Sequence, residues 1–293
     1  MRTLHMILDW FPNTIHAGML LAQSRGYYAE KNLALSISGD VHGVLEAPET
    51  IDFVVGPEAS ILTEIAENGS IIGIASLSYR QDSGIISLKE TGIKRPKDLT
   101  GKRITHWTPA WFHAVVGELV NRDGGDYEKV EKIPMDVGEP EEVLGKVADA
   151  IWIYKYWEYF VMKQAGFEVN YIPFVDYGQP FNYPAPAMAA RRALVEEEPE
   201  VVADFLAATE KGYQDLVNEG PALLPEIEAK LPDVDRSILI EGIKHLQPLL
   251  LDPQGRWGRI QTADWIALQD FLQEKGILGE KKLPNTYCNA FRN

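Results

Sequence analysis

Polar and aromatic side chains follow the first apolar run of the chain. After Met6–Leu8 come Asp9, Trp10, Asn13 and His16, and a longer amphipathic segment begins. The turn at the end of a strand is where α/β proteins commonly place groups that contact ligands. These four residues offer a carboxylate, an indole, an amide and an imidazole. The combination suits a flat, nitrogen-rich ring, which the indole can stack against and the polar groups can orient.

A second turn of this kind follows the run Asp52–Val55. It reads Gly56, Pro57 and Glu58. Glycine permits close approach of a ligand to the backbone, and Glu58 can accept hydrogen bonds. A carboxylate in the first turn of a helix is also favoured by the helix dipole alone, so both interpretations of Glu58 stay open. In the same way, His16 could contact a ligand or cap its own helix.

Two aromatic stretches, Trp107–His113 and Trp152–Tyr159, follow further along the chain. The first begins at the predicted start of a helix, which suits binding of a polar or anionic group, and the second follows a predicted strand. Part of each stretch must pack into a core. The candidate ligand contacts from this half of the chain are Trp107, Trp111, Trp152, Tyr154, Tyr177 and Tyr183.

Signals for catalysis or metal binding are absent from the sequence. There is no Gly-x-Ser-x-Gly elbow, no Walker loop and no His-Glu-x-x-His pair. Cys288 is the single cysteine, which excludes an internal disulfide and a thiolate metal cluster. Asp9 and Glu58 could act as an acid–base pair, but nothing fixes their spacing. We therefore expect no catalytic residue, no metal and no cofactor.

Composition restricts the class of protein. The 293 residues are enough for one large domain or two, with 45% hydrophobic and 24% charged residues. A net charge of −15 without a basic cluster argues against nucleic-acid binding. No run is long enough to span a bilayer. Because Met1–His5 reads as the start of a strand, we expect no signal peptide in this segment. We expect an extracytoplasmic protein if a leader is removed, and a cytoplasmic one otherwise.

Short β-rich runs alternate with amphipathic segments, which predicts an α/β fold with largely parallel sheets. From Glu196 onward the apolar spacing is helical. Gly26 and Gly69 are placed to end helices, and Thr108–Pro109 reads as an N-cap followed by proline at the first helical position. The predicted strands are Leu4–Leu8, Ala34–Ile37, Asp52–Val55, Ile71–Leu77, Ile85–Ser87, Arg103–His106, Lys132–Pro134, Ala150–Ile153, Val169–Pro173 and Ala187–Ala190.

Two segments, Ser78–Gly84 and Tyr183–Ala187, interrupt this alternation and read as crossovers. They predict one lobe of residues 1–84 plus 187–293, and a second lobe of residues 85–186. Small ligands commonly bind between such lobes, so we expect the candidate residues to line a cleft there.

The motifs resemble those of the NMT1/THI5-like family over nearly the whole chain. The resemblance implies a periplasmic-binding-protein type II fold, with two lobes, two crossovers and a ligand cleft. The stretches that carry it are Leu8–Asn13 with His16, Gly26–Tyr28, Gly56–Glu58, Asp98–Ile104 and Asp176–Gly178.

Two functions are implied by this resemblance. One is the substrate-binding protein of an ABC importer for a thiamin pyrimidine precursor of the formylaminopyrimidine or hydroxymethylpyrimidine type. Such a protein would be a monomer with an ABC permease as partner, and related receptors take riboflavin-type or other heterocycles. The other is an enzyme of thiamin pyrimidine metabolism, a synthase that uses pyridoxal phosphate and iron.

The sequence departs from the synthase pattern. Gly56 stands where the synthase has its Schiff-base lysine, Ser60 falls near its substrate histidine, and residues 182–190 hold no cysteine. Binding relatives have a glutamate shortly after the segment matching Asp176–Gly178, and residues 180–186 contain no acid. Asp9 or Glu58 could supply that carboxylate. The expected function is the receptor, with the enzyme as the alternative.

Overall fold

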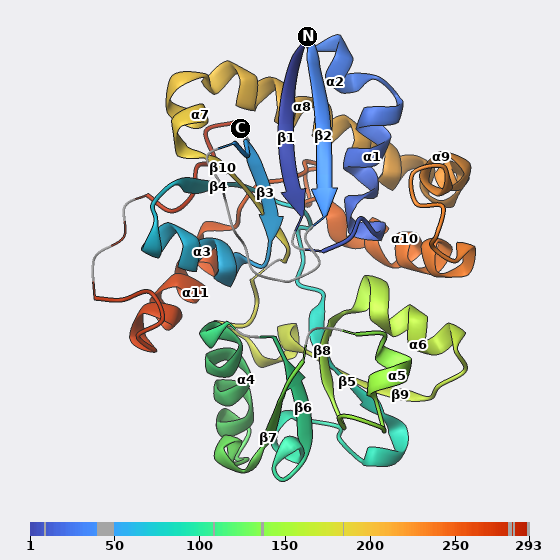
Figure 1. The fold of residues 1–293 in the computed structure, drawn as a ribbon, viewed down its shortest axis with the longest axis vertical. Helices are drawn as coiled ribbons and strands as arrows, with labels where there is room; N and C mark the ends of the chain where they lie inside the picture. Colours follow the sequence, from blue (N-terminus) through green and yellow to red (C-terminus); the bar gives the residue numbers. More distant parts are fainter. Residues whose placement is uncertain are drawn as a thin grey trace. The chain divides into compact units, whose positions relative to one another are not determined.

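The computed structural model describes residues 1–8, 10–39, 50–107, 109–135, 138–183, 185–280, 283 and 285–291. The chain divides into two compact units (Figure 1). Unit 1 comprises Met1–Gln81 and Tyr183–Asn293, and unit 2 comprises Asp82–Asn182. The chain thus leaves unit 1 once and returns to it once.

Unit 1 is built on a five-stranded sheet in the order β2-β1-β3-β10-β4. Its strands are β1 (Arg2–Leu8), β2 (Leu33–Gly39), β3 (Phe53–Gly56), β4 (Ile71–Ser76) and β10 (Ala187–Arg191). The first three are parallel, whereas β10 runs antiparallel to both of its neighbours. Both β3 and β4 are buried along their whole length, as expected for strands covered on two faces.

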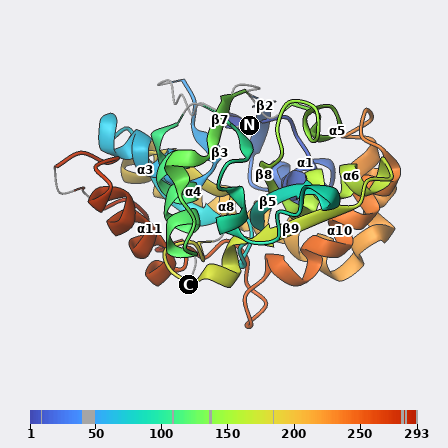
Figure 2. The same cartoon turned by 90° about the horizontal axis from the view of Figure 1, so that it is seen from below.

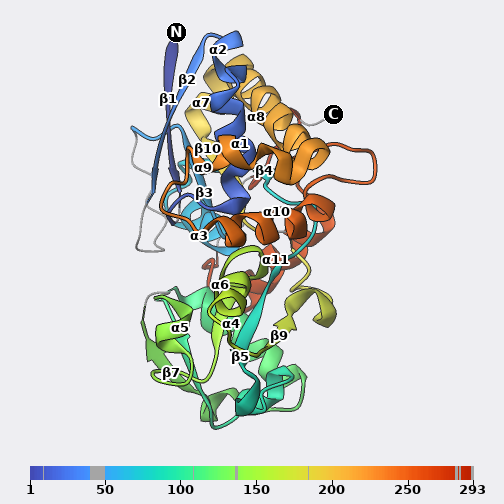
Figure 3. The same cartoon turned by 90° about the vertical axis from the view of Figure 1, so that its right-hand side faces the viewer.

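Helices cover the sheet of unit 1. Gly18 of α1 and Gly212 of α8 meet so closely that a Cβ on Gly212 would lie 2.0 Å from the carbonyl oxygen of Gly18. Figure 3 shows α1 running beside α8. The helices of this unit are α1 (Ala17–Ser24), α2 (Tyr27–Glu30), α3 (Glu58–Glu67), α7 (Arg192–Glu197), α8 (Pro199–Glu219), α9 (Leu224–Glu228), α10 (Arg236–Leu250) and α11 (Thr262–Glu274).

Tyr213 of α8 connects this helix to the turn that precedes α1. Its ring stacks on Trp257 with centroids 4.4 Å apart, and its hydroxyl donates to the carbonyl oxygen of Ile15 at 2.7 Å. The indole of Trp257 donates in turn to the carbonyl oxygen of Leu77 at 2.8 Å. Because all three groups are buried, these bonds hold the Ile15 turn in a fixed position.

Unit 2 has an antiparallel sheet in the order β8-β5-β9 and a parallel pair, β6 and β7. Its strands are β5 (Ser83–Leu88), β6 (Arg103–His106), β7 (Glu131–Pro134), β8 (Ile151–Tyr154) and β9 (Val169–Pro173). A parallel bridge from β6 to the residue before β8 joins the two sheets.

The main helix of unit 2 is α4 (Ala110–Arg122), and α5 (Pro140–Val143) and α6 (Phe160–Gln164) are short. Figure 2 shows α4 and α6 separated by the strands of this unit. In the described part of the chain, no helix of either unit has the length and apolar character required to cross a bilayer.

The predicted strands are confirmed, each within a few residues of its expected limits. The expectation of largely parallel sheets is wrong, since β5 and β10 each pair antiparallel with two neighbours. Each of these two strands begins within a few residues of the point where the chain changes units. Each runs in the direction opposite to its neighbours in the sheet. The prediction that Pro109 is the first helical residue is also wrong. Its ψ of 136° is extended, so it is the N-cap residue that precedes α4.

Candidate functional site

The turn between β1 and α1 is organised by its own side chains. The Oδ1 atom of Asn13 accepts from the amide of Ile15 at 3.2 Å, and its Nδ2 atom donates to the carbonyl oxygen of Phe11 at 3.3 Å. The amide of Asn13 donates to Nδ1 of His16 at 3.1 Å. Asn13 and His16 therefore form a reciprocal cap, and the capping interpretation of His16 is confirmed.

The cap determines the state of the imidazole. His16 is 2% exposed, and burial lowers its pKa to about 3, so the ring is neutral near pH 7. Because Nδ1 accepts a hydrogen bond, the single ring proton resides on Nε2. His16 thus presents a buried N–H donor on the side of the ring away from the cap.

Trp10 lies in the same turn, next to the end of β2. Its ring packs against Phe11 with centroids 4.1 Å apart and a tilt of 48°, and it stays half-buried. Its carbonyl oxygen lies 3.0 Å from where a Cβ on Gly39 would be, so a larger residue there would displace the turn. Trp10 is thus a half-buried residue on a turn whose backbone packs tightly against Gly39. Asp9, the neighbouring candidate, lies outside the described residues.

Glu58 and Tyr183 come from two other strand ends at the same edge of the unit 1 sheet. Glu58 begins α3 directly after β3, and Tyr183 lies shortly before β10, whose residue Ala187 pairs with Gly56. Both side chains are buried, at 1% and 2% exposure. Burial, and to a lesser extent the charge of Glu58, raise the pKa of Tyr183 well above its usual range.

Unit 2 contains a cluster of aromatic rings around Trp152. Trp107, Trp111, Phe112 and Phe174 surround it, with ring centroids 5.8, 5.5, 5.3 and 4.6 Å from that of Trp152. Most of these contacts are edge-to-face or tilted, the arrangement that aromatic quadrupoles favour. Trp111 and Trp152 are buried at 1% and 3% exposure, whereas Trp107 is half-buried and supplies the exposed side of the cluster.

Tyr154 lies at the end of β8, where a π-helical turn, Lys155–Tyr159, begins. Its ring stacks on Tyr156 with centroids 5.4 Å apart. Two buried carboxylates hold this turn: Glu158 accepts from the amide of Tyr154 at 3.0 Å, and Asp82 accepts from the amide of Tyr156 at 2.9 Å. Single π-helical turns are frequent at functional sites. Neither carboxylate stands out in the sequence, and no motif links Asp82 to a segment so distant in the chain.

Tyr177 lies apart from the aromatic cluster within unit 2. Its pKa is raised by burial and then by the charge of Asp123, and is lowered by Arg95, so it neighbours these two residues. Asp123 follows the C-terminal end of α4, whereas Trp107 and Trp111 are at the N-terminal end. A helix of 13 residues is about 20 Å long. The structure therefore groups Trp107, Trp111 and Trp152 but not Tyr177.

Three of the candidate residues share a feature that the sequence cannot show. Nε2 of His16 and the hydroxyl of Tyr183 in unit 1, and Nε1 of Trp152 in unit 2, are buried without a hydrogen-bond partner among the described residues. Buried polar atoms are satisfied in most proteins, and each exception calls for an explanation such as a bound ligand or water. These atoms are the strongest structural pointers to ligand binding on the predicted residues.

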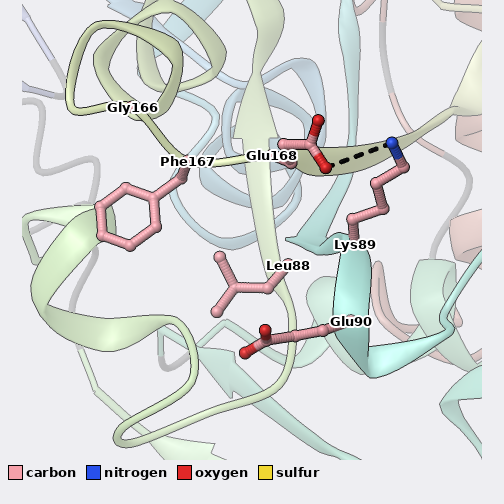
Figure 4. A pocket seen from close by; sticks show the side chains of 6 residues that line it. All are labelled: Leu88, Lys89, Glu90, Gly166, Phe167 and Glu168. Atoms are coloured by element: carbon pink, nitrogen blue, oxygen red, sulfur yellow. Dashed lines mark hydrogen bonds and ion pairs between the residues drawn. The ribbon is translucent and has the colours of Figure 1, made fainter.

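A surface hollow of about 510 Å³ lies elsewhere in unit 2, where β5 ends (Figure 4). Leu88 and Phe167 form its apolar part, and Lys89 and Glu168 pair across it at 3.3 Å. None of the residues predicted from sequence lines it. Over the described residues, no group of three or more histidine, cysteine, aspartate or glutamate side chains is placed to hold a metal ion.

Comparison with known proteins identifies a family. The sequence profile described as NMT1/THI5 like matches residues 13–221. The formylaminopyrimidine-binding protein of Halalkalibacterium halodurans is 27% identical over 278 residues, which cover 90% of this chain and 83% of that protein. The 4-amino-5-hydroxymethyl-2-methylpyrimidine phosphate synthase of Legionella pneumophila is 25% identical over 148 residues, 49% of this chain and 46% of that protein.

Among solved structures, the alkanesulfonate-binding protein SsuA of Xanthomonas axonopodis pv. citri matches with a TM-score of 0.74 at 12% identity. The match covers 97% of this chain and 96% of that one. The expected periplasmic-binding-protein fold is therefore confirmed. At this identity the likeness concerns the fold alone, because one fold accommodates many ligands.

Proposed function

The chain belongs to the NMT1/THI5-like family, and from this premise we propose that it is the substrate-binding protein of an ABC importer for a thiamin pyrimidine precursor. The ligand class is that of formylaminopyrimidine, as named for the relative that matches 90% of the chain. Binding leaves the ligand chemically unchanged.

The observation that supports this proposal most is that several candidate residues have buried polar atoms without a hydrogen-bond partner among the described residues. Two of these atoms lie in unit 1 and one lies in unit 2. The candidate set also includes the half-buried tryptophans Trp10 and Trp107. Stacking surface with a few convergent polar groups is what a flat heterocycle requires. We propose that Trp10, Asn13, His16, Glu58 and Tyr183 of unit 1 contact the ligand.

From unit 2 we propose Trp107 as the stacking residue, with Trp111 and Trp152 supporting it from within the aromatic cluster. Tyr154 stays a candidate because it ends β8 and precedes the π-helical turn. Tyr177 is the weakest candidate, since it neighbours Arg95 and Asp123. Asp9 also remains in the proposed set.

As a receptor the protein would act outside the cytoplasm and as a monomer, and would deliver its ligand to a permease. The alternative is an enzyme of thiamin pyrimidine metabolism, which the name of the Legionella relative favours. The sequence argues against it, because Gly56 stands where the synthase pattern has its lysine and Ser60 falls near its substrate histidine. Without an amine at residue 56, pyridoxal phosphate has no Schiff-base partner there.

A ligand screen tests the proposal. The purified protein is analysed by native mass spectrometry for a retained small molecule, and then by thermal shift with formylaminopyrimidine, hydroxymethylpyrimidine, riboflavin and an alkanesulfonate. A true ligand at 100 times its Kd should stabilise the protein by about 2.7 kcal/mol. Stabilisation by the pyrimidines alone supports the proposal, and stabilisation by riboflavin or the sulfonate alone contradicts it.

A further inference from the structure

We propose that residues 285–289 form a detachable strap that seals the free edge of the unit 1 sheet, and that this edge pairs with a second copy of the chain when the strap is released. The inference concerns self-association and does not depend on the identity of the ligand. The edge in question is the outer side of β4.

The strand β4 has the properties of one that recruits other strands. It is the last strand in the sheet order, with β10 as its neighbour on the inner side. Its sequence, Ile71–Ser76, contains three isoleucines, no charged residue and no proline, and all six residues are buried. Apolar, uncharged strands at the edge of a sheet pair readily with extended segments of other chains. A stable monomer therefore requires that the outer hydrogen-bonding groups of β4 are covered.

The strap covers this edge at Gly73. The amide of Gly73 donates to the carbonyl oxygen of Thr286 at 3.0 Å, and its carbonyl oxygen accepts from the amide of Cys288 at 2.8 Å. These bonds form a parallel bridge. Further along β4, the amide of Ser76 donates to the carbonyl oxygen of Gly258 at 3.1 Å. The strap thus occupies backbone groups that a strand from another chain would need.

Glycine at position 73 permits this close approach. A Cβ on Gly73 would lie 2.9 Å from the Cη2 atom of Trp265 and 3.3 Å from the carbonyl oxygen of Thr286. Trp265 belongs to α11 and is 2% exposed, so its ring has little room to move. The missing side chain therefore lets the indole and the strap pack against the same residue of β4.

Two side chains anchor the strap. Thr286 is buried, and its Oγ1 atom accepts from the indole N–H of Trp265 at 3.0 Å and donates to Oε1 of Gln269 at 2.7 Å. The side-chain amide of Asn289 accepts from the backbone amide of Ile260 at 3.1 Å and donates to its carbonyl oxygen at 2.9 Å.

The other residues of the strap are partly or fully exposed. A segment with so little buried apolar surface can open without unfolding of the rest of the domain. The hydrogen bonds of Thr286 and Asn289 should therefore control how often the edge of β4 is uncovered.

Two measurements on the full chain test the inference. Hydrogen exchange of the amides of Gly73 and Cys288 reports release of the strap, and sedimentation velocity over a range of concentrations reports self-association. Thr286→Val keeps the shape of the side chain and removes its hydroxyl. It should accelerate exchange at both amides about tenfold and produce dimers or larger species as the concentration rises.

Matched variants separate the strap from general effects. Thr286→Ser retains the hydroxyl and should exchange and sediment like the unaltered protein. Asn289→Ala removes the second anchor and should act in the same direction as Thr286→Val, so it carries the test if the valine variant does not fold. Tyr287→Phe removes only an exposed bond to Thr262 at 3.0 Å and should change neither measurement.

Urea unfolding verifies that each variant is folded before the comparison. Exchange at the parent rate in both Thr286→Val and Asn289→Ala overturns the anchoring of the strap. Faster exchange in a protein that stays monomeric at every concentration overturns the pairing with a second copy. Dimers of the unaltered protein at the same concentrations would contradict the sealing of the edge.

Discussion

His16 holds a buried imidazole that stays neutral far below its ordinary titration range. The unfolded chain takes up a proton on this residue below about pH 6.5, whereas the folded protein does so only near the lowered pKa of about 3. Between these values the unfolded state binds more protons, so the unfolding free energy decreases as the pH falls. The contribution of His16 is about 1.4 kcal/mol per pH unit in this window.

Urea unfolding of the parent protein and His16→Asn between pH 7 and pH 4.5 measures this contribution. We expect the difference in unfolding free energy between the two proteins to change steadily below pH 6.5 in favour of the variant. Curves that run parallel over the window would mean that the imidazole is accessible to protons in the folded state.

Trp10 is the stacking residue of the proposed unit 1 site. Its ring is half-buried and contacts Phe11, so its removal should cost little folding stability. Trp10→Ala should weaken binding of the pyrimidine by about tenfold or more, because stacking and buried ring area are lost. Titration calorimetry checks this, with Trp10→Phe as the variant that retains a ring. Unchanged affinity in Trp10→Ala would remove the indole from the site.

The cap of this turn could be predicted from the sequence because the information is local. Asn13 and His16 are three positions apart, which is the spacing of a capping box, and Trp10 precedes them on the same turn. The placement of Glu58 and Tyr183 at the same sheet edge could not be found, because it arises from the pairing of β3 with β10. Nor does any sequence pattern reveal that Nε2 of His16 has no partner among the described residues.

The contact between α1 and α8 is the packing element most sensitive to substitution. A Cβ on Gly212 would overlap the carbonyl oxygen of Gly18. Both residues lie in helices, so the overlap could be relieved only by moving the two helices apart. Gly212→Ala should therefore destabilise the protein by about 3 kcal/mol or more, although alanine favours helix. Because α8 also holds Ile15 through Tyr213, ligand affinity should fall as well.

Denaturant unfolding measures this effect. Lys211→Ala is the matched control on the adjacent exposed position of α8, where an exposed ion pair with Glu30 and a cation–π contact with Tyr27 at 5.0 Å are lost. Such pairs contribute about 0–1 kcal/mol, so the control should be close to the parent protein. A Gly212→Ala variant as stable as this control would contradict the close packing of the two helices.

Strand positions could be predicted from the sequence because short apolar runs between turn residues identify them. Strand directions could not be predicted from the sequence. The composition of β5 and β10 resembles that of their neighbours, and only their place in the sheet makes them antiparallel. The error at Pro109 has a similar origin, since proline is compatible with both the N-cap and the first helical position.

At the scale of the whole molecule, the proposed ligand contacts of unit 2 can be tested apart from those of unit 1. Trp107 is the residue to change, because it is half-buried and belongs to the aromatic cluster around Trp152. Trp107→Ala should weaken binding of the same pyrimidine by about tenfold while unit 1 is unaltered. Its control is Phe167→Ala, an exposed ring at the separate hollow of unit 2, which should leave affinity unchanged. Equal affinities in both variants would remove Trp107 from the proposed ligand contacts.

The central claim is that the protein binds a thiamin pyrimidine precursor and releases it unaltered. The most direct measurement is calorimetric titration with formylaminopyrimidine, followed by mass spectrometry of the ligand recovered after prolonged incubation. We predict saturable binding of one molecule per chain and recovery of the ligand at its original mass. Conversion of the ligand to a product of different mass, or the absence of saturable binding, would contradict the account.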